Sequence, residues 1–511
     1  MRIDVRERAG KRARSFRVVG NLACLVVAGG FGAAAHAIPG PANCTALLGM
    51  AVQSGTVTAV DRFAQGSVIQ GSGGLFGDGN TTVAANMCRV KMVLTPTQSS
   101  SINIEAWLPE TWNNKMFTYG GGGFSGGLGQ SAKYMNTALG TGYASATSDL
   151  GHPTSSSATW ALNQPEKVID FGHRGNHLVA VTAKQVMNAY YQLPVQRAYF
   201  QGCSDGGREA LGEVIRYPGD YNGVIAGASA NYFGEQMAFQ VWTDRLRSTV
   251  PNLNWKLSAV NTAVMNACDA LDGVKDGKIE NPKACNWDPA AIQCTLFDTT
   301  SCLNATEVAV MRKFYDGPRL ATGELVYSGR ARGSEGGWAS SDLLNTAGGQ
   351  EYFRNFVYNN PNWSESNFNI DVDVPYSRTY VEPNVNADNP DIRPFIQAGG
   401  KLIMYHGWAD QEVPSANSVR FYEAASNIVG SSIGSNARLF MDPGTQHTCE
   451  DGINLVPHLE AWVENGVAPT RIIKTTTSGT TTITHPLCPW PQTAKYNGSG
   501  STTDAANFTC Q

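Results

Sequence analysis

The sequence predicts an α/β fold: a core of alternating buried strands and helices, interrupted by a large insertion. Two observations predict it. The segment Ala198–Leu211 combines a short apolar run, a glycine-bracketed turn and a good helix-forming stretch. From about Asn231 to Ile392, by contrast, strand alternation is weak, and cysteine, tryptophan, glycine and short helical patterns are mixed. With 511 residues, 42% apolar and 16% charged, the chain is globular and long enough for one large domain or two.

The predicted elements follow from apolar spacing taken along the chain. The strand segments are Met87–Leu94, Ile102–Leu108, Met116–Tyr119, Gly142–Asp149, Ala198–Phe200, Val224–Ala228, Lys401–Gly407 and a shorter one at the start of Leu439–His447. The helical segments are Asn176–Tyr191, the stretch opened by Arg208, one that ends within Arg393–Gly400, and Leu455–Asn465. We therefore expect four parts: a leader over 1–37, core over 38–230, a lid over 231–392 and core over 393–511.

The pentapeptide Gly202-Cys203-Ser204-Asp205-Gly206 lies between a predicted strand and a predicted helix. Strand, Gly-x-Ser-x-Gly and helix form the nucleophile elbow of an α/β-hydrolase, which predicts an α/β-hydrolase core. The turn lifts the Ser204 hydroxyl clear of the sheet and aims the Asp205 N–H at a developing oxyanion. The alternative is a glycine-rich structural turn.

A glycine-rich loop, Gly120–Gly127, follows the early strand Met116–Tyr119. α/β-Hydrolases place the second oxyanion donor after such a strand, and we assign it to Gly122 or Gly123. A merely flexible loop is the alternative. A phosphate loop is poorly supported because no Gly-Lys-Ser/Thr follows.

Ser204, Asp410 and His447 occur in the order nucleophile, acid, base, each just beyond a predicted strand. His447 would take the proton of Ser204, and Asp410 would orient the imidazole. Among the competitors, His406 lies inside a strand and is assigned a structural role, and Asp442 is awkwardly close to His447. Two further histidine positions have simpler explanations: His458 as an amphipathic helix residue, and the pair His173 and His177 as helix-start hydrogen-bonding groups rather than metal ligands.

Residues 1–37 have the pattern of a signal peptide: basic Arg2–Arg17, apolar Val18–Ala35 and the small-x-small site Ala35-His36-Ala37. This predicts a secreted or periplasmic protein; a single membrane anchor is the alternative. The net charge of −4 gives no electrostatic footprint for nucleic acid, and no other stretch is apolar enough to span a membrane.

Ten cysteines remain after the leader is removed, because Cys24 leaves with it. An even number in an exported chain predicts a disulfide framework, and the absence of C-x-x-C arrays argues against zinc. Order along the chain suggests the local pairs Cys44–Cys88, Cys268–Cys285, Cys294–Cys302 and Cys488–Cys510, which leaves Cys203 for Cys449. This connectivity is a hypothesis, because a sequence alone does not fix it.

Three aspartates and two glycines cluster within Cys268–Lys278, inside the predicted lid. Hard oxygen ligands at this density suggest Ca²⁺. The spacing is not that of an EF-hand, and a solvated acidic turn is an equal alternative.

Three motifs together resemble the tannase and feruloyl esterase family. They are Cys203-Ser204-Asp205-Gly206-Gly207-Arg208, Tyr405-His406-Gly407-Trp408-Ala409-Asp410 and Pro443-Gly444-x-x-His447. The resemblance covers essentially the whole mature chain. It implies an α/β-hydrolase core, a lid with a structural calcium, and a disulfide that joins the cysteines beside the catalytic serine and histidine.

Carried onto this sequence, the calcium ligands are the side chains of Asp269, Asp272 and Asp276 and the main-chain carbonyls of Val274 and Lys278. The resemblance also implies the five disulfides suggested above. The chain departs from the family at one point, since Thr448 separates His447 from Cys449 where the family has His-Cys, which puts the histidine loop in question.

The resemblance further implies a serine esterase that cleaves esters of aromatic acids through an acyl-enzyme. We rank feruloyl or hydroxycinnamoyl esters first, gallate esters second and terephthalate monoesters third, with small aromatic or plant-polymer esters as partners. The acid pocket is expected between the glycine loop and the lid. Its candidates are Trp338, Phe353, Phe356 and Val413, although core packing is the favoured alternative for each of the three aromatics. Nothing in the sequence aims Arg330 or Arg332 inward. A catalytically inactive binding protein on the same fold is the non-enzyme alternative.

Overall fold

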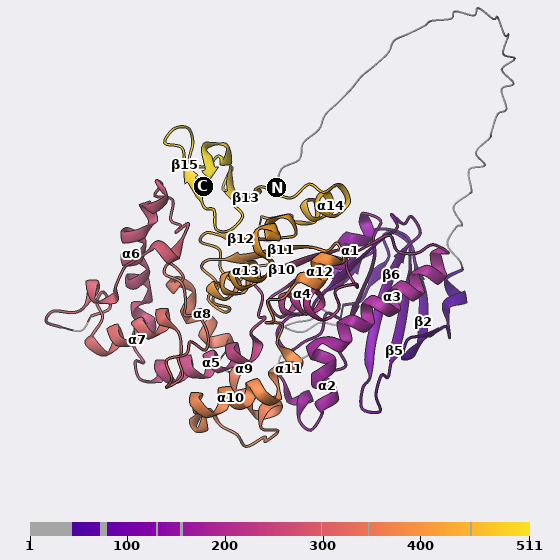
Figure 1. Cartoon of the computed structure of the whole chain (residues 1–511), viewed down its shortest axis with the longest axis horizontal. Coiled ribbons are helices and arrows are strands. Elements are labelled where there is room, and N and C mark those ends of the chain that lie inside the picture. The colour runs from indigo at the N-terminus through magenta and orange to yellow at the C-terminus, as the bar shows by residue number, and fades with distance from the viewer. Residues whose placement is uncertain are drawn as a thin grey trace, which may run out of the picture. The chain divides into compact units, whose positions relative to one another are not determined.

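A ten-stranded sheet organises the protein, and the computed structural model describes residues 43–71, 79–128, 131–153, 157–297, 299–345, 347–449 and 452–511 (Figure 1). The predicted leader lies outside the described residues. In spatial order the strands are β1 (Ala51–Val52), β2 (Gly55–Phe63), β5 (Met87–Leu94), β6 (Ile102–Pro109), β8 (Ala144–Ser148), β7 (Lys115–Tyr119), β9 (Arg197–Cys203), β10 (Gly223–Gly227), β11 (Lys401–Gly407) and β12 (Ala437–Asp442). The predicted strands are all present in this sheet.

The sheet changes character halfway across. Strands β1, β2, β5, β6 and β8 pair antiparallel, whereas β8, β7, β9, β10, β11 and β12 pair parallel. The register aligns the last residues of the parallel strands: Gly227 pairs with Cys203 and Tyr405, and Gly407 pairs with Asp442. The loops that leave β9, β11 and β12 therefore emerge at one edge of the sheet, where open α/β sheets place functional groups.

Helices cover both faces of the sheet, because alternate side chains of each buried strand point to opposite sides. On β9, Phe200 packs in the core that holds Val179 and Ala210, whereas Tyr199 packs in the core that holds Leu139 and Trp462. Helices that contribute to the first core include α3 (Gly175–Tyr191), α4 (Asp205–Arg216) and α13 (Ala416–Val429), and those that contribute to the second include α1 (Ala132–Gly140) and α14 (Val456–Asn465). The short helix α2 (Pro165–Ile169) leads into α3 through a π-turn at Asp170–Arg174. The predicted α/β fold is confirmed.

The segment between β10 and β11 is helical, and none of its described residues joins the large sheet. Its helices are α5 (Phe233–Ser248), α6 (Leu257–Cys268), α7 (Ala305–Asp316), α8 (Glu335–Asn345), α9 (Gly348–Tyr352), α10 (Ile370–Tyr380), α11 (Glu382–Val385) and α12 (Arg393–Gln397). Figure 1 shows α6, α7 and α8 away from the antiparallel strands β2, β5 and β6. Part of the segment has a core of its own, with Val260, Met311 and Trp338.

Short strand pairs complete the described chain, and the sequence patterns did not predict them. Near the C-terminus β13 (Ile472–Ser478) pairs with β14 (Thr481–Leu487), and β15 (Ala494–Tyr496) pairs with β16 (Phe508–Cys510). Near the N-terminus β3 (Val68–Ile69) pairs with β4 (Thr81–Thr82). None of the helices that the structure describes has the length and apolar character needed to span a membrane.

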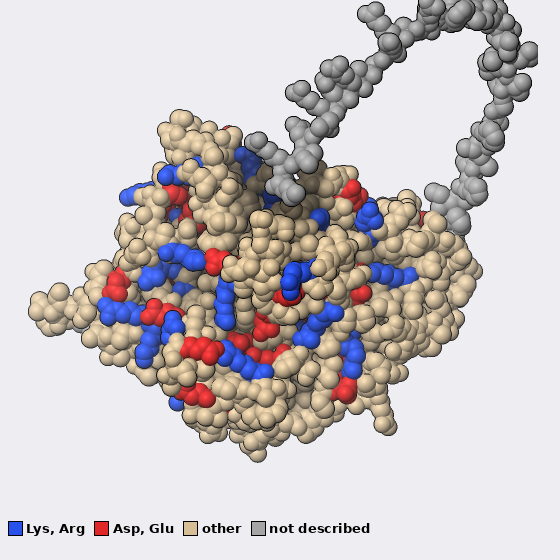
Figure 2. Space-filling model, viewed as in Figure 1, with Lys and Arg blue, Asp and Glu red and all other residues tan. Residues whose placement is uncertain are grey.

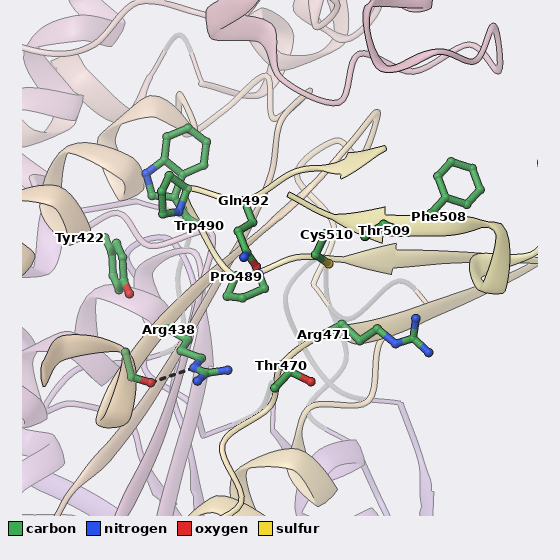
Figure 3. Close-up of a pocket in the computed structure, with 12 residues that line it drawn as sticks. Tyr422, Arg438, Thr470, Arg471, Pro489, Trp490, Gln492, Phe508, Thr509 and Cys510 are labelled. Atoms are coloured by element: carbon green, nitrogen blue, oxygen red, sulfur yellow. Dashed lines mark hydrogen bonds between the residues drawn. The ribbon is translucent and has the colours of Figure 1, made fainter. Parts of the chain in front are cut away.

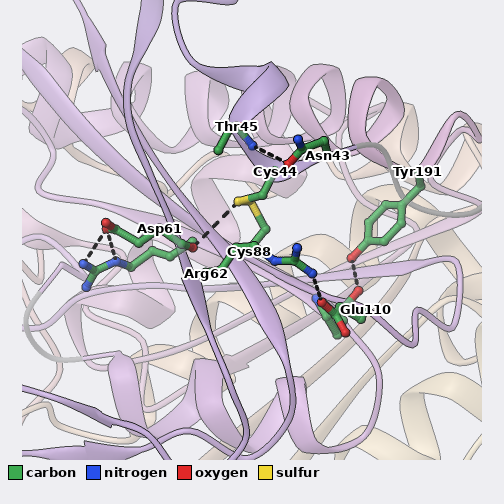
Figure 4. Close-up of a disulfide and its surroundings, with 10 residues drawn as sticks. Asn43, Cys44, Thr45, Asp61, Arg62, Cys88, Glu110 and Tyr191 are labelled. Atoms are coloured by element: carbon green, nitrogen blue, oxygen red, sulfur yellow. Dashed lines mark hydrogen bonds and ion pairs between the residues drawn. A yellow bond between two sulfur atoms is a disulfide. The ribbon is translucent and has the colours of Figure 1, made fainter.

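Five disulfides tie these elements together, and they form at the five pairs suggested by the sequence. Cys44–Cys88 fastens the first turn to the buried strand β5, beside the ion pairs of Arg62 with Glu110 and of Arg89 with Asp61 (Figure 4). The bridges therefore link segments across the sheet as well as within the helical insertion.

Two surface features stand apart from the strand ends. On the face shown in Figure 2, acidic and basic side chains are scattered over a mostly uncharged surface. A cleft of about 700 Å³ lies between α13, β12 and the C-terminal strands, lined by residues that include Tyr422, Arg438, Arg471 and Trp490 (Figure 3). None of the three predicted catalytic residues lines this cleft, so it is separate from the site described next.

Candidate active site

The nucleophile elbow forms as the glycine pattern predicts, because backbone segments approach one another too closely for side chains. A Cβ added at Gly202 would lie 1.9 Å from the Gly206 carbonyl oxygen, and one at Gly206 would lie 2.6 Å from the Gly121 carbonyl oxygen. Ser204 itself has φ 62° and ψ −122°, a conformation that non-glycine residues rarely adopt. The strained turn places the Ser204 hydroxyl at the end of β9, partly exposed.

The structure brings Ser204, His447 and Asp410 into one hydrogen-bonded chain. His447 Nε2 lies 2.9 Å from Ser204 Oγ, and His447 Nδ1 lies 2.6 Å from Asp410 Oδ2. The Asp410 side chain is completely buried, and the backbone N–H groups of Glu412 and Val413 each donate to its Oδ1 at 2.8 Å. This is the geometry in which a histidine removes the proton of a serine hydroxyl while a carboxylate orients its ring.

The electrostatic environment of the site favours the charged forms of the Asp410 carboxylate and the His447 imidazole. Burial acts to raise the pKa of Asp410, but the neighbouring His447 and His406 outweigh it and hold that pKa far below its usual range. Burial likewise acts to lower the pKa of His447, but the charge and hydrogen bond of Asp410, with the charge of Glu412, raise it to about 9. Asp410 therefore stabilises the imidazolium that forms during proton transfer.

The competing residues occupy other positions. Asp442 is buried and accepts a hydrogen bond from Lys474 Nζ at 2.8 Å, so it is engaged away from His447. His458 is half-buried on α14. His173 and His177 meet the end of α4, where His173 Nδ1 lies 2.7 Å from the Tyr217 hydroxyl and His177 Nδ1 lies 2.7 Å from Asp220 Oδ2. The hydrogen-bonding role expected for this pair agrees with these contacts.

The histidine loop accommodates Thr448. Thr448 is exposed, and its N–H donates to the Gln446 carbonyl at 2.7 Å. The next residue, Cys449, still forms the disulfide with Cys203, with a Cα–Cα distance of 5.9 Å that lies in the ordinary range for such bonds. The extra residue is thus absorbed after His447, and the bridge joins the nucleophile elbow to the histidine loop.

The glycine loop lies directly against the elbow. The Gly121 N–H is held by the buried carboxylate of Glu209, at 3.1 and 3.3 Å from its two oxygens, so this amide points into the protein. Gly122 N makes only a long contact of 3.4 Å with the Ser125 carbonyl, and Gly123 lies exposed at the loop tip with φ 60°. The two amides assigned as oxyanion donors are thus less firmly held than that of Gly121.

Asp205 opens α4 with its side chain fixed by Arg208. The guanidinium contacts the carboxylate at 2.5 and 2.9 Å and lies 4.5 Å from the ring centre of Phe171. The backbone N–H of Asp205 thereby stays at the start of α4, next to the nucleophile. The sequence analysis missed Glu209 and Arg208, although the Asp205–Arg208 spacing of three residues at a helix start is a signal for such a pair.

Aromatic residues of the helical insertion pack against the glycine loop. The ring of Phe124 lies 5.8 Å from that of Phe356 and 5.7 Å from that of Phe233, centre to centre. Phe353 is fully buried in the same core, whereas Trp338 belongs to the core of the inserted helices. Val413 is buried, and its backbone contacts Asp410 and His406.

Arg330 and Arg332 of the helical insertion lie among aromatic rings. Arg330 is buried, with its guanidinium carbon 5.0 Å from the ring centre of Trp338. Arg332 lies over the ring of Tyr315 and donates to the Trp287 carbonyl.

The acidic cluster of the helical insertion is partly organised by its own backbone. Asp269 accepts N–H groups of Asp276, Gly277 and Lys278, and Asp272 accepts that of Val274. Within the described residues, no three His, Cys, Asp or Glu side chains form a metal-binding group on their own. However, Asp276 Oδ1 is buried without a hydrogen-bond partner. Burial, with the charges of Asp276 and Glu280, raises the pKa of Asp272 to about 6. Asp276 Oδ2 lies 3.9 Å from Lys278 Nζ, but three carboxylates this close in sequence, one with a buried oxygen that lacks a partner, fit a hard cation.

Comparisons with known proteins agree with this geometry. The family model for tannase and feruloyl esterase matches residues 88–511. A probable feruloyl esterase B-2 of Aspergillus flavus is 30% identical over 433 residues, which cover 78% of this chain and 81% of that protein. The crystal structure of feruloyl esterase B from Aspergillus oryzae aligns with a TM-score of 0.84 at 27% identity, over 90% of this chain and 98% of that one.

A fold relative extends the comparison. The tannin acyl hydrolase from Aspergillus niger aligns with a TM-score of 0.73 at 22% identity, over 92% of this chain and 94% of that one, and so shares the fold. The resemblance inferred from the three sequence motifs is confirmed. The chain belongs to the tannase and feruloyl esterase family, and it is a carboxylic ester hydrolase with an α/β-hydrolase core.

Proposed function

We propose that this protein is a secreted serine esterase that hydrolyses esters of hydroxycinnamic acids such as ferulate. The observation that carries the proposal is the chain Ser204–His447–Asp410 at the end of a strained elbow. The relatives named as feruloyl esterases support the choice of acid. The five disulfides and the signal-like residues 1–37 support export, to the periplasm or beyond.

The reaction follows from the roles of the three side chains. His447 Nε2 takes the proton of Ser204 as Oγ attacks the ester carbonyl, and Asp410 stabilises the resulting imidazolium. The N–H groups of Asp205 and of Gly122 or Gly123 stabilise the oxyanion. His447 then protonates the departing alcohol, which leaves an acyl-enzyme on Ser204. A water molecule, deprotonated by His447, attacks that acyl-enzyme and releases the acid.

The acid pocket is proposed between the glycine loop and the lid segment. The cluster of Phe124, Phe233 and Phe356 supports this position, because it brings aromatic rings of both segments together. Phe233 also lies 5.3 Å from the guanidinium carbon of Arg208, in the helix that follows the elbow. An aromatic acid gains from such neighbours both by burial of its ring and by edge-to-face contacts.

Initial rates on four esters test the proposal: methyl ferulate, methyl gallate, chlorogenate and mono(2-hydroxyethyl) terephthalate. We expect a preference for ferulate or chlorogenate, and no turnover by the Ser204→Ala variant, whose fold is checked by circular dichroism. A preference for the gallate or the terephthalate ester would show that the hydroxycinnamate assignment is wrong and would assign that acid instead. Turnover retained by Ser204→Ala would refute Ser204 as the nucleophile.

We further propose that the acidic cluster holds a structural calcium ion. Side chains of Asp269, Asp272 and Asp276 and the carbonyls of Val274 and Lys278 would hold it, and the ion would supply stability rather than chemistry. A chelator should lower the melting temperature, and added Ca²⁺ should restore it. Asp276→Asn should remove most of that response, with Asp288→Asn, an exposed aspartate that pairs with Arg312, as the control. An unchanged melting curve with chelator would count against the site.

A further inference from the structure

A second histidine contacts the catalytic carboxylate. His406 lies in β11, four residues before Asp410, and its side chain is completely buried. Its Nε2 lies 3.0 Å from Asp410 Oδ2, the same oxygen that His447 Nδ1 contacts at 2.6 Å. One carboxylate oxygen is therefore shared between two imidazole rings.

The neighbours of His406 define which ring nitrogen carries its proton. Nε2 also lies 2.9 Å from the Val413 carbonyl, and because a carbonyl and a carboxylate both accept, Nε2 must be the donor. Nδ1 lies 2.7 Å from the Ser418 hydroxyl on α13, which is able to donate to it. With the proton on Nε2 and the Ser418 hydroxyl donating to Nδ1, both ring nitrogens are satisfied.

The sharing matters because Asp410 has no further acceptor capacity. Its Oδ1 receives two backbone N–H groups and its Oδ2 receives two imidazoles, which fills the four sites of a carboxylate. A second hydrogen bond donated to Oδ2 stabilises part of the negative charge of Asp410. Less of that charge then acts to stabilise a protonated His447. Because Oδ1 is held separately, loss of His406 leaves the carboxylate oriented toward His447 but changes the charge that His447 experiences.

We propose that His406 is a positioning residue that divides the charge of Asp410 between two imidazoles, so that His447 releases its proton more readily. The inference rests on the proposed serine esterase mechanism. The other titratable groups that act on this pair are Glu412, whose Oε2 lies 3.8 Å from His447 Nε2, and Tyr327 and Arg330 of the lid segment. These groups are unchanged by a substitution at His406, so the effect of His406 is separable from theirs.

The test compares the pH dependence of kcat/KM for His406→Leu and His406→Gln, on an ester that does not ionise. The acid limb of this profile reports the proton affinity of the general base in the free enzyme. In His406→Leu we expect the acid limb to move to higher pH by about one unit. At neutral pH kcat/KM should therefore fall about tenfold, and it should recover at higher pH. In His406→Gln, which keeps an N–H donor, the limb should stay near that of the wild type. KM should change little in either variant.

Controls distinguish a failure of this inference from a failure of the proposed esterase mechanism and from misfolding of the variant. His458→Leu removes a half-buried histidine of α14 and should leave the limb in place. A limb that is unmoved or lowered in a folded His406→Leu variant would overturn the proposal, whereas an inactive wild type would overturn the esterase mechanism itself. If His406→Leu does not fold, nitrogen-15 NMR of histidine-labelled wild type decides: a proton on His406 Nε2 supports the proposal, and a bare Nε2 overturns it.

Discussion

At Ser204 the backbone adopts φ 62°, at a cost of about 1–3 kcal/mol for a residue other than glycine. Hydrogen bonds of the elbow over-determine this conformation. The Ser204 N–H donates to the Gly227 carbonyl at 3.0 Å, and the Ser204 carbonyl accepts from Gly207, Arg208 and Ala230. Strand β10 and helix α4 thus hold the nucleophile in place, so the serine hydroxyl meets His447 without rearrangement.

The pKa of His447 predicts the pH range of activity. Burial lowers it, but Asp410 and Glu412 together raise it to about 9, and a general base works only in its unprotonated form. We expect kcat/KM for a non-ionising ester to rise from neutral pH, to reach half its maximum near pH 9 and to level off only above that pH. Asp410→Asn, which removes the stabilising charge, should shift the limb to lower pH and reduce kcat. A wild-type plateau that already begins at pH 6 would contradict this assignment.

Glu209 is expected to hold the glycine loop in its active position. Its carboxylate accepts from the Gly121 N–H and, at 2.9 Å, from Asn176 Nδ2. Glu209→Ala leaves both donors unpaired, at about 1–3 kcal/mol each, and frees the loop that supplies an oxyanion donor. We expect kcat to fall by up to about a hundredfold with a small change in KM. Glu209→Gln keeps one acceptor and should be milder. Unchanged kcat in a destabilised Glu209→Ala variant would show that the contact is only structural.

Among the elements, the loop after β12 is the one that must be held most firmly, because it carries His447 between two anchors. On one side Lys474 of β13 donates to Asp442 Oδ2 and, at 2.5 Å, to Thr445 Oγ1. On the other side Cys449 is bonded to Cys203. The Thr445 carbonyl also accepts the Ala409 N–H at 2.9 Å, which ties the histidine loop to the loop of Asp410.

Replacing both Cys203 and Cys449 with alanine tests the covalent anchor. The bridge spans 246 residues, and its loss should lower the free energy of unfolding by about 2–5 kcal/mol. It should also lower kcat, because the histidine loop is no longer tied to the elbow. The control is the double alanine variant of Cys294 and Cys302. That disulfide joins residues only 8 positions apart in the helical insertion, so its loss should affect stability alone. Equal kcat in the two double variants would refute a catalytic role for the bridge.

Helices α5 and α11 meet through a buried pair of carboxylates. Asn386 Nδ2 lies 3.0 Å from Glu235 Oε2 and 3.1 Å from Glu382 Oε2, and Arg378 Nε lies 3.2 Å from Glu235 Oε1. Burial, followed by the charge of Glu235, raises the pKa of Glu382 well above its ordinary value. Because the folded-state pKa is the higher one, the stabilising contribution is complete below about pH 4.5 and is lost as pH rises through the raised value.

Thermal unfolding from pH 5 to 10 measures that loss. The wild-type melting temperature should decline toward alkaline pH, and Glu382→Gln should decline less, since its neutral amide has no proton to lose. Glu423→Gln, at an exposed position on α13, should follow the wild type. Parallel curves for Glu382→Gln and the wild type would show that this pair does not govern the pH response.

For the molecule as a whole, periodicity and glycine placement located eight of the ten strands of the sheet, all but β1 and β2, and pointed to Ser204, Asp410 and His447. Strand ends such as Gly227 and Gly407 are visible in the sequence, and parallel register brings the residues after them together. The buried supports were not visible. Glu209 and Lys474 find their partners only when segments far apart in sequence pack, as with Lys474 and Asp442, 32 positions apart. His406 was assigned a structural role from its strand position, but its contact with Asp410, only four residues away, was not foreseen. The C-terminal strand pairs were missed for a similar reason, since β13 and β14 are threonine-rich and weakly apolar.

The most direct test of the account labels the enzyme with an organophosphonate that reacts with activated serines. The account predicts that one equivalent abolishes ester hydrolysis and that peptide mass mapping finds the adduct on Ser204. The same reagent should leave His447→Gln unlabelled, because the serine then has no base. Full activity after complete labelling, or an adduct on another residue that tracks the loss of activity, would contradict the assignment of Ser204, His447 and Asp410 as the catalytic chain.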